Sequence, residues 1–315
     1  MNIGLDMMGG DFAPLEAVKG LKKFLSVNSH AVTIFCIGDE TLVQPLLAEY
    51  EVLSPNIHLV HAPEVIGYNE HPTKALKEKT QSSIAIGFQL LATGKIDAFI
   101  SAGNTGAMLV GAMFTIKAIE GLIRPCVSGI VPKTNGETGM ILDVGLNADC
   151  KPEQLNQFAI LGSLYAQYIL NIPNPKIGLL NVGEEEGKGN LLAQATFPIL
   201  KENPSINFIG NIEGRDLFGT KADVIVCDGF TGNIVLKMAE TVYDLAETRN
   251  FHNDEYFNRF HYENYGGSPV LGVAKPVILG HGISSAKAFT NMIQLATQMV
   301  ETDVCAKMAE SFKAS

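Results

Sequence analysis

The sequence predicts an α/β fold in which a mostly parallel sheet lies between two layers of helices. The first indication is the regular alternation of short apolar runs with segments of helical periodicity, which is typical of repeated β–α–β units. The second is a hydrophobic content of 46% over 315 residues, which suffices for a large core. The third is an excess of glycine, at 31 residues, found largely where the apolar runs lead into helical segments.

The expected strands are short runs rich in β-branched residues, most of which end at Gly, Asn or Asp. Their continuous apolar character suits strands that are buried on both faces, as parallel strands usually are. In chain order they are 3–6, 32–38, 57–61, 98–101, 139–144, 176–181, 206–210 and 222–228.

The expected helices lie between these runs and have apolar residues at helical spacing. They are 14–25, 41–51, 82–94, 106–119, 152–169, 191–202 and 234–248, followed by one long helix or two over 284–313. The length suits one large α/β unit or two linked lobes. Because no repeat, low-complexity tract or linker interrupts the pattern, we expect residues 1–315 to act as a single unit.

Composition and charge exclude several classes of protein. The chain has 23 basic and 33 acidic residues, a net charge of −10 and no tryptophan, so we expect no nucleic-acid partner. The five cysteines are scattered and form no C-x-x-C pair, which argues against disulfide and zinc frameworks. The N-terminus lacks the basic segment of a secretory signal, and no apolar run is long enough for a spanning helix. These features predict a cytoplasmic location.

Common catalytic motifs are also missing. No G-x-G-x-x-G dinucleotide fingerprint follows a strand, and no G-x-S-x-G nucleophile elbow is present. Histidines and cysteines do not cluster, so the sequence predicts neither a metal site nor a Cys–His nucleophile.

In parallel sheets, ligands bind at the carboxyl ends of the strands, where the glycine-bearing loops of this chain fall. Two such loops follow the first and fourth strands. Their N–H groups, at the starts of helices, could hold an anion, although tight strand-to-helix packing would explain the small residues equally well. The candidate substrate-binding residues here are Asp6, Gly9, Gly10, Asp11, Gly103, Asn104, Thr105 and Gly106.

The loop after the sixth strand carries Lys188 between Gly187 and Gly189. Glycine on either side allows unusual backbone angles, so the ammonium group can be delivered into a cleft. The spacing is not that of a Walker A loop. The acidic triplet at 184–186 fits a solvated loop face. Asn181 and Gly183 are further substrate-binding candidates in this loop.

The loop after the eighth strand leads to Asn233 at the start of a helix. An amide side chain beside free backbone donors is the layout of an oxyanion or phosphate site. The alternative is that Asn233 is an N-cap, which is a common role for asparagine. The companion candidates are Asp143, in a similar glycine-bearing loop, and Asp228, Gly229, Thr231 and Gly232.

Taken together, these loops resemble those of one family. The matching segments occur in the family's order: 6–14, 101–107, 142–145, 179–183, 188–190, 207–211, 228–233 and 264–267. The chain resembles the PlsX-type phosphate acyltransferases, which make acyl phosphate from acyl-acyl-carrier-protein and inorganic phosphate for phospholipid synthesis. The resemblance runs from Met1 to about residue 300.

The resemblance implies a fold similar to the isocitrate/isopropylmalate dehydrogenases and to phosphotransacetylase, with a cleft and a homodimer. It implies no metal and no bound cofactor, and it assigns the catalytic roles to Lys188 and Asn233. The other glycine loops would line the phosphate and acyl-chain cleft. The implied partners are acyl carrier protein, inorganic phosphate, the downstream glycerol-3-phosphate acyltransferase and, peripherally, the inner face of the membrane.

The chain departs from the family pattern in two places. Lysines stand at 74 and 77, where arginines are usual, and a guanidinium grips phosphate with two donors whereas an ammonium does not. The segment 241–265 is shorter than the helical arm of many relatives, which is associated with membrane contact. Its aromatic residues suit core, a dimer contact or a lipid-facing patch, and we favour the first two: Phe251, Tyr256, Phe257, Phe260, Tyr262 and Tyr265.

Three other functions compete with this one. A phosphate acetyl- or butyryltransferase that uses acyl-coenzyme A would share the reaction type. A metal- and NAD-dependent decarboxylating dehydrogenase would share the fold but needs clustered aspartates and a Tyr–Lys pair, which the sequence does not reveal. A non-enzymatic scaffold that binds acyl carrier protein would leave Lys188 and Asn233 without a role.

Overall fold

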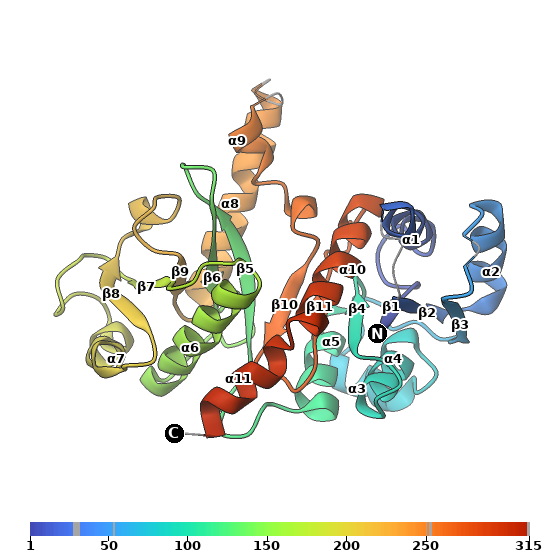
Figure 1. Cartoon of the computed structure of the whole chain (residues 1–315), viewed down its shortest axis with the longest axis horizontal. Coiled ribbons are helices and arrows are strands. Elements are labelled where there is room, and N and C mark those ends of the chain that lie inside the picture. The colour runs from blue at the N-terminus through green and yellow to red at the C-terminus, as the bar shows by residue number, and fades with distance from the viewer. Residues whose placement is uncertain (28–31, 53, 250, 252–253, 314–315) are drawn as a thin grey trace. The chain divides into compact units, whose positions relative to one another are not determined.

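The computed structural model describes residues 1–27, 32–52, 54–249, 251 and 254–313 (Figure 1). The chain forms two compact units. The first unit comprises Met1–Ala118 and Tyr262–Cys305, and the second comprises Ile119–His261 and Ala306–Ser315. The sequence predicts that residues 1–315 form one catalytic unit. This concerns activity rather than compactness, and it stays a prediction.

The sheet of the first unit is parallel except at one edge. Its strands lie in the order β3-β2-β1-β4-β11-β10, and only β10 runs antiparallel to its neighbour β11. The last two strands were not expected from the sequence. The bounds are β1 Asn2–Asp6, β2 Thr33–Gly38, β3 Ile57–His61, β4 Ala98–Ser101, β10 Ser268–Leu271 and β11 Val277–Leu279.

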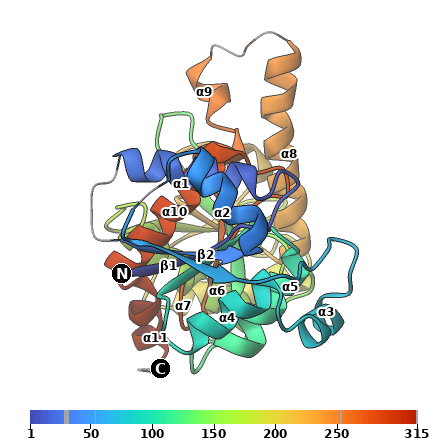
Figure 2. The same cartoon turned by 90° about the vertical axis from the view of Figure 1, so that its right-hand side faces the viewer.

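Helices cover both faces of this sheet, with α1 and α10 on one side and α4 and α5 on the other (Figures 1 and 2). Helices α1 and α10 pack closely because residue 20 is glycine, where a Cβ atom would lie 2.5 Å from the Cβ of Phe289. The bounds are α1 Leu15–Val27, α2 Glu40–Glu49, α3 Pro72–Glu78, α4 Ser83–Ala92, α5 Thr105–Gly111, the π-helical turn η1 Ala112–Ile116, η3 Tyr262–Asn264 and α10 Ala286–Glu301.

The sheet of the second unit begins with an antiparallel hairpin and continues with parallel strands, in the order β5-β6-β9-β7-β8. Strand β5 was not expected from the sequence, and β8 ends two residues later than expected. The bounds are β5 Cys126–Pro132, β6 Thr138–Leu142, β7 Lys176–Leu180, β8 Asn207–Ile212 and β9 Val224–Val226.

Helices α6 and α8 lie on opposite faces of this second sheet. Leu142 contacts Gly162 of α6, whereas Gly129, which pairs with Ile141, contacts Leu236 of α8. Successive strand residues point to opposite faces, so the two helices form separate layers. The bounds are α6 Pro152–Tyr168, α7 Leu191–Glu202, η2 Gly214–Asp216, α8 Gly229–Thr248, α9 Glu255–Asn258 and α11 Val304–Lys313. The predicted mostly parallel sheets with helices on both sides are therefore confirmed.

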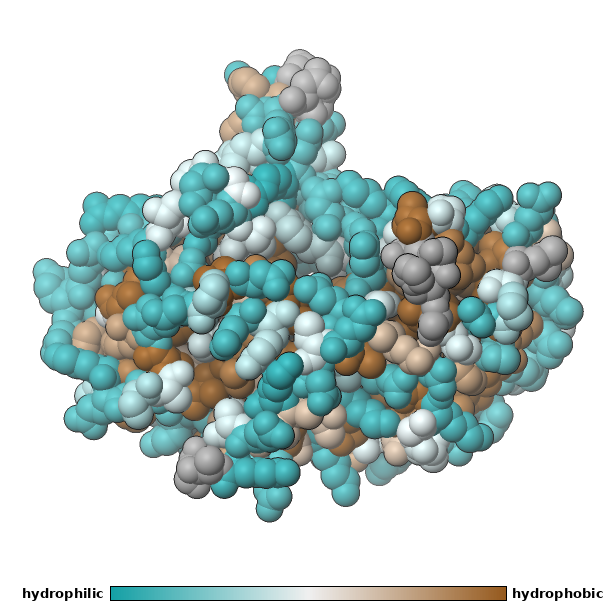
Figure 3. Space-filling view, in the orientation of Figure 1, coloured by the Kyte–Doolittle hydropathy of each residue, from teal (hydrophilic) through white to brown (hydrophobic). Residues whose placement is uncertain are grey.

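Helix α8 is longer than expected and projects with α9 from the second unit (Figures 1 and 2). The side of this projection shown in Figure 3 is mostly hydrophilic. The aromatic residues of the segment 241–265 differ in exposure: Phe260 is 6% exposed and stacks edge-on with Phe218, whereas Phe251 is 55% exposed. Residues 250, 252 and 253 of that segment lie outside the described residues. Among the helices described, none is long and apolar enough to cross a membrane.

The second unit contains a buried ion pair between Lys133, at the β5–β6 hairpin, and Asp223, just before β9. The side chain of Lys133 is 3% exposed. The second carboxylate oxygen of Asp223 accepts a hydrogen bond of 2.8 Å from the backbone N–H of Lys176. The pair thus connects the hairpin to the parallel part of the sheet.

We expect the substitution Lys133→Ala to lower the free energy of unfolding by about 3–5 kcal/mol, because it leaves Asp223 as an unpaired, largely buried charge. Urea denaturation followed by circular dichroism measures the change. The double variant Lys133→Met/Asp223→Asn removes both charges and should recover much of the loss. A cost below about 1 kcal/mol for the single variant would show that solvent reaches Asp223.

Candidate functional site

Three polar residues lie within two positions of the ends of neighbouring strands of the second unit. Asp143, Asn181 and Asp228 come after β6, β7 and β9, and these strands are parallel, with β9 between the other two. Their carboxyl ends therefore meet at one edge of the sheet, as the sequence predicted. The loops at this edge carry the predicted catalytic residues Lys188 and Asn233.

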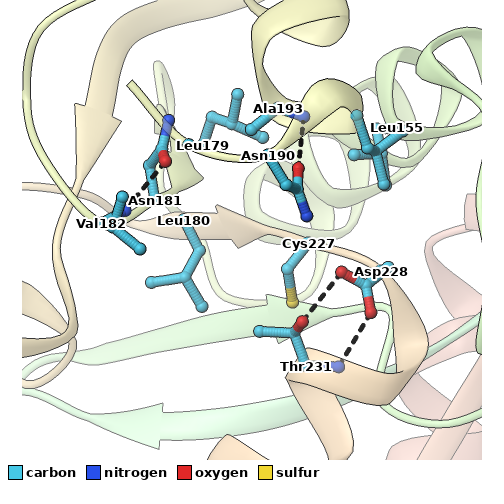
Figure 4. Close-up of a pocket in the computed structure, with 12 residues that line it drawn as sticks. Leu155, Leu179, Leu180, Asn181, Val182, Asn190, Ala193, Cys227, Asp228 and Thr231 are labelled. Atoms are coloured by element: carbon cyan, nitrogen blue, oxygen red, sulfur yellow. Dashed lines mark hydrogen bonds between the residues drawn. The ribbon is translucent and has the colours of Figure 1, made fainter.

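Asp228 is the N-cap of α8. Its carboxylate accepts hydrogen bonds from the backbone N–H of Thr231 at 2.9 Å and from the Thr231 hydroxyl at 2.8 Å (Figure 4). Asn233 lies in the fifth position of the helix, so the alternative interpretation of Asn233 as the cap is wrong. Its side chain is exposed beside the loop after β6, where a Cβ atom on Gly145 would lie 3.5 Å from its Oδ1 atom.

The loop after β6 packs against the start of α8 at distances that only glycine permits. A Cβ atom on Gly232 would lie 1.9 Å from the carbonyl oxygen of Asp143, and one on Gly229 would lie 2.6 Å from that of Asn147. A side chain at either position would displace the helix from the loop. The two predicted glycines therefore set where Asn233 lies.

The side chain of Asp143 is fully buried. It accepts hydrogen bonds from the backbone N–H of Val127 at 2.8 Å, from that of Asn147 at 2.6 Å and from the Asn147 amide at 2.9 Å. Burial raises its pKa above the ordinary value, and these hydrogen bonds oppose the rise. The carboxylate of Asp143 therefore makes hydrogen bonds that stabilise the loop after β6. That Asp143 belongs to a substrate-binding loop stays a prediction.

Lys188 is exposed on the loop between β7 and α7. The Asn181 amide donates a hydrogen bond of 3.1 Å to its carbonyl oxygen. Gly189 has a φ of +94°, and a Cβ atom there would lie 2.2 Å from Oδ1 of Asn181. Both the backbone angle and the lack of space require glycine at this position. The loop backbone is thereby held at the carbonyl group of the lysine and at the residue that follows it.

The charges of this loop leave the Lys188 ammonium uncommitted. Glu184 pairs with Lys221 at 2.6 Å, and Glu186 pairs with Lys201. Among the residues that the structure describes, no carboxylate forms an ion pair with Lys188. A positive charge that has no carboxylate partner can interact with an anionic ligand.

A pocket of about 210 Å³ lies between this loop and the start of α8 (Figure 4). The predicted residues Asn181, Asp228 and Thr231 line it, together with Asn190, which the sequence interpretation missed. Asn190 caps α7, and an asparagine directly before a helical segment is the signal that could have identified it. The remaining lining is mostly apolar: Leu155, Leu179, Leu180, Val182, Gly189, Leu192, Ala193 and Cys227.

The other predicted loops belong to the first unit. Strands β1 and β4 pair in parallel, and the Ser101 hydroxyl donates a hydrogen bond of 2.6 Å to the buried carboxylate of Asp6. A Cβ atom on Gly9 would lie 2.6 Å from the backbone nitrogen of Gly103. Loops 6–11 and 101–106 are therefore in contact. Burial raises the pKa of Asp6, and hydrogen bonds, including that from Ser101, oppose the rise.

The side chain of Asn104 makes its hydrogen bonds within the first unit. Its Oδ1 atom accepts from the backbone N–H of Ala107 at 2.9 Å and so caps α5. Its amide donates to the carbonyl oxygen of Gly67 at 2.8 Å. Thr105 and Asp11 are exposed near the same strand ends, and Gly10 has a φ of +108°. Asn104 thus shapes the loop, while the side chains of Thr105 and Asp11 are exposed.

Comparison with known proteins identifies the family. The chain matches the family described as "Fatty acid synthesis protein" over residues 1–248 and 251–307. It is 43% identical to the phosphate acyltransferase of Dictyoglomus turgidum, over 98% of this chain and 97% of that protein. The chain belongs to the PlsX-type phosphate acyltransferase family. The phosphate acyltransferase of Thermoanaerobacterium thermosaccharolyticum is also 43% identical, over 96% and 94% of the two chains.

Solved structures outside this acyltransferase family share its fold. A phosphotransacetylase from Streptococcus pyogenes superposes with a TM-score of 0.70 at 18% identity, covering 96% of this chain and 94% of that one. A 4-hydroxythreonine-4-phosphate dehydrogenase from Klebsiella pneumoniae has a TM-score of 0.55 at 11% identity, with 95% and 97% covered. The predicted likeness to the phosphotransacetylase fold is confirmed.

The capping geometry predicts different consequences for Asp228 and Asn233. We expect Asp228→Ala to lower the free energy of unfolding by about 1 kcal/mol, because α8 loses its cap. Asn233→Ala serves as the control and should leave stability within about 0.5 kcal/mol, since its side chain is exposed and does not cap. Guanidinium denaturation of both variants measures the difference. An equal loss in both would contradict the assignment of the cap to Asp228.

Proposed function

We propose that this phosphate acyltransferase family member transfers a fatty acyl group from acyl-acyl-carrier-protein to inorganic phosphate and releases acyl phosphate for phospholipid synthesis. The observation that supports the proposal is the ammonium of Lys188, which has no ion-pair partner among the described residues. Its backbone is held by Asn181 and Gly189, which line a small pocket with polar groups. Membership of a family described by fatty acid synthesis supports a fatty acyl group rather than a short one.

The chemistry requires positioning and charge stabilisation more than nucleophile activation. A phosphate oxygen attacks the thioester carbonyl carbon, the carbonyl oxygen becomes an oxyanion, and the new C–O bond persists as the C–S bond breaks. The oxyanion re-forms the carbonyl as the carrier leaves as a thiolate, and the thiolate takes up, by way of water, the proton that hydrogen phosphate gives up. Lys188 would balance the charge of the phosphate, and the amide of Asn233 would donate to phosphate or to the oxyanion.

The other predicted loops keep the roles expected from the sequence. Loops 6–11 and 101–106 of the first unit stay predicted substrate-binding loops. Asp228, Gly229, Thr231 and Gly232 would shape the phosphate side at the start of α8. We expect no metal and no bound cofactor in the reaction. Within the described residues, no three His, Cys, Asp or Glu side chains are grouped as metal ligands.

The cellular setting follows from the proposed product. Acyl phosphate is a reactive mixed anhydride, so a glycerol-3-phosphate acyltransferase at the inner face of the membrane is the proposed consumer. All five cysteines have free thiols, which supports a cytoplasmic location. The proposed membrane contact would be peripheral.

A trapping assay tests the donor and the product. The purified protein is incubated with palmitoyl-acyl-carrier-protein and phosphate, and hydroxylamine converts any acyl phosphate to a hydroxamate. We expect hydroxamate only when phosphate is present. Strong turnover of butyryl-coenzyme A with none of palmitoyl-acyl-carrier-protein would favour the short-chain transferase instead.

Kinetics of variants test the two catalytic residues. We expect Lys188→Ala to raise the KM for phosphate and lower kcat, and Asn233→Ala to lower kcat by about 10²–10³-fold, as for other lost oxyanion donors. Lys201→Ala is the matched control, because that lysine belongs to the same unit and is already paired with Glu186. A folded Lys188→Ala or Asn233→Ala enzyme with near-normal turnover would remove that residue from the site.

We also propose that the protein forms a homodimer through α8. Large apolar side chains on this helix recur at intervals of four residues and are exposed: Phe230 at 64%, Ile234 at 48% and Met238 at 65%. Leu245, 60% exposed, continues the same face seven residues later. Such a stripe on one helix suits packing against a second copy.

A charge placed in this stripe should weaken the dimer. We expect Met238→Asp to shift the protein toward monomer at micromolar concentration in sedimentation velocity experiments, because the carboxylate would have to be desolvated at the contact. Lys237→Ala, at the neighbouring position outside the stripe, is the control. A monomeric wild-type protein, or a stripe that binds only anionic vesicles, would contradict the dimer.

A further inference from the structure

The first unit contains a second pocket, which none of the predicted site residues lines. Its volume is about 600 Å³, within the range of roughly 300–1,000 Å³ typical of sites for small organic ligands. It lies between α3, α4 and α5 with η1, which Figures 1 and 2 show beside one another. The pocket of the second unit has about 210 Å³, which suits a small anion better than a long chain.

The inner wall of this pocket is apolar and well packed. Phe88 of α4 is 2% exposed and meets Phe99 edge-on, with ring centroids 5.2 Å apart. Gly111 allows Phe88 to approach α5, since a Cβ atom there would lie 2.1 Å from the ring. Leu76, Ala85, Ala92 and Val110 contribute the other apolar groups.

The outer part of the pocket is built by η1, where the helix widens to the π form. This turn presents Phe114, which is 71% exposed and lines the pocket. Short π-helical turns occur frequently at functional sites. The polar side chains that line the pocket are all exposed: Thr73, Lys77, Gln89, Thr93 and Thr115. A ligand would therefore meet hydrocarbon inside and polar groups only at the solvent side.

The pocket continues from one of the predicted substrate loops. Gly106 begins α5 against the start of α3, where its Cβ position lies 2.4 Å from Cγ of Pro72. Val110 follows Gly106 by four residues and so lies on the same face of α5, one turn further along. Leu76 follows Pro72 by the same interval on α3. Leu76 and Val110 both line the pocket, which therefore begins about one helical turn beyond the Gly103–Gly106 loop.

We infer that this pocket binds the hydrocarbon chain of the acyl donor, with the thioester end at the Gly103–Gly106 loop and the methyl end beside Phe88 and Phe114. The inference rests on the proposed function, which supplies the acyl chain. A hydrocarbon chain needs no hydrogen-bond partners, which matches the inner wall. The aliphatic stem of Lys77 extends the apolar surface while its ammonium stays in water.

Binding can be tested apart from turnover because the protein has no tryptophan. The variant Phe114→Trp places the only tryptophan at the pocket, and Leu42→Trp, at an exposed position of α2 in the same unit, is the matched control. The probe is a fatty acid of sixteen carbons brominated at mid-chain, which quenches indole fluorescence on contact. We expect saturable quenching of Phe114→Trp, reversed by unbrominated palmitate, and none of Leu42→Trp.

Two results would overturn the inference. One is quenching that is absent or equal in both variants. The other is quenching of Phe114→Trp by vesicles of brominated phospholipid but not by the brominated acid, which would mean that this face meets a lipid surface.

Chain-length kinetics give a second readout. Ala92 is an exposed residue of α4 that lines the pocket, so Ala92→Phe would place a ring in it. Ala48→Phe makes the same change at an exposed position of α2 and is the control. We expect Ala92→Phe to raise the KM for the palmitoyl donor by roughly fourfold for each displaced CH₂, or about 15-fold for two, with little change for a hexanoyl donor. Ala48→Phe should match the wild type.

The two proposals fail in different ways. A wild-type protein that makes no acyl phosphate from any donor would reject the proposed function, while the quenching experiment would still decide whether the pocket takes a hydrocarbon chain. An active wild type whose palmitoyl KM is unchanged by Ala92→Phe would reject the pocket and leave the function standing.

Discussion

Helix α8 can begin where it does only because residues 229 and 232 have no side chains. The carbonyl oxygens of Asp143 and Asn147 occupy the space that a Cβ atom would need. This contact brings the loop after β6 against the first turn of α8, and with it the cap at Asp228 and the amide of Asn233. An alanine at either glycine would force the helix and the loop apart, so the edge of the second sheet depends on this approach more than on any single hydrogen bond.

The acidic character of the chain does not prevent an anion from binding beside Lys188. The net charge of −10 is spread over the whole chain, and exposed charges more than about 8–10 Å apart are largely screened in physiological salt. Nearby, Glu184 and Glu186 are matched by Lys221 and Lys201, which leaves the unpaired ammonium as a local excess of positive charge. Local pairing, rather than overall charge, therefore decides what this loop attracts.

The parallel strands and the loops at their carboxyl ends could be predicted because apolar runs followed by glycine have a direct physical meaning. Strands β10 and β11 have only four and three residues, and β5 pairs with β6 in a hairpin, so β5, β10 and β11 lacked the β–α–β alternation that guided the prediction. The cap at Asp228 was missed because Asn233 also has the chemistry of a cap. The apolar pocket was missed because residues of several separate helices line it. The spacing of apolar residues within any one helix does not show which helices come together.

The pocket beside Lys188 also contains a thiol, that of Cys227, which is 3% exposed. Burial, reinforced by the negative charges of Asp228 and Asp143, raises the pKa of this thiol well above its ordinary value. A thiol that stays protonated is a poor nucleophile. With the thioester donor proposed above, a reactive cysteine at this position would take the acyl group itself and leave an acylated protein. The burial of Cys227 directly after β9 would prevent that side reaction.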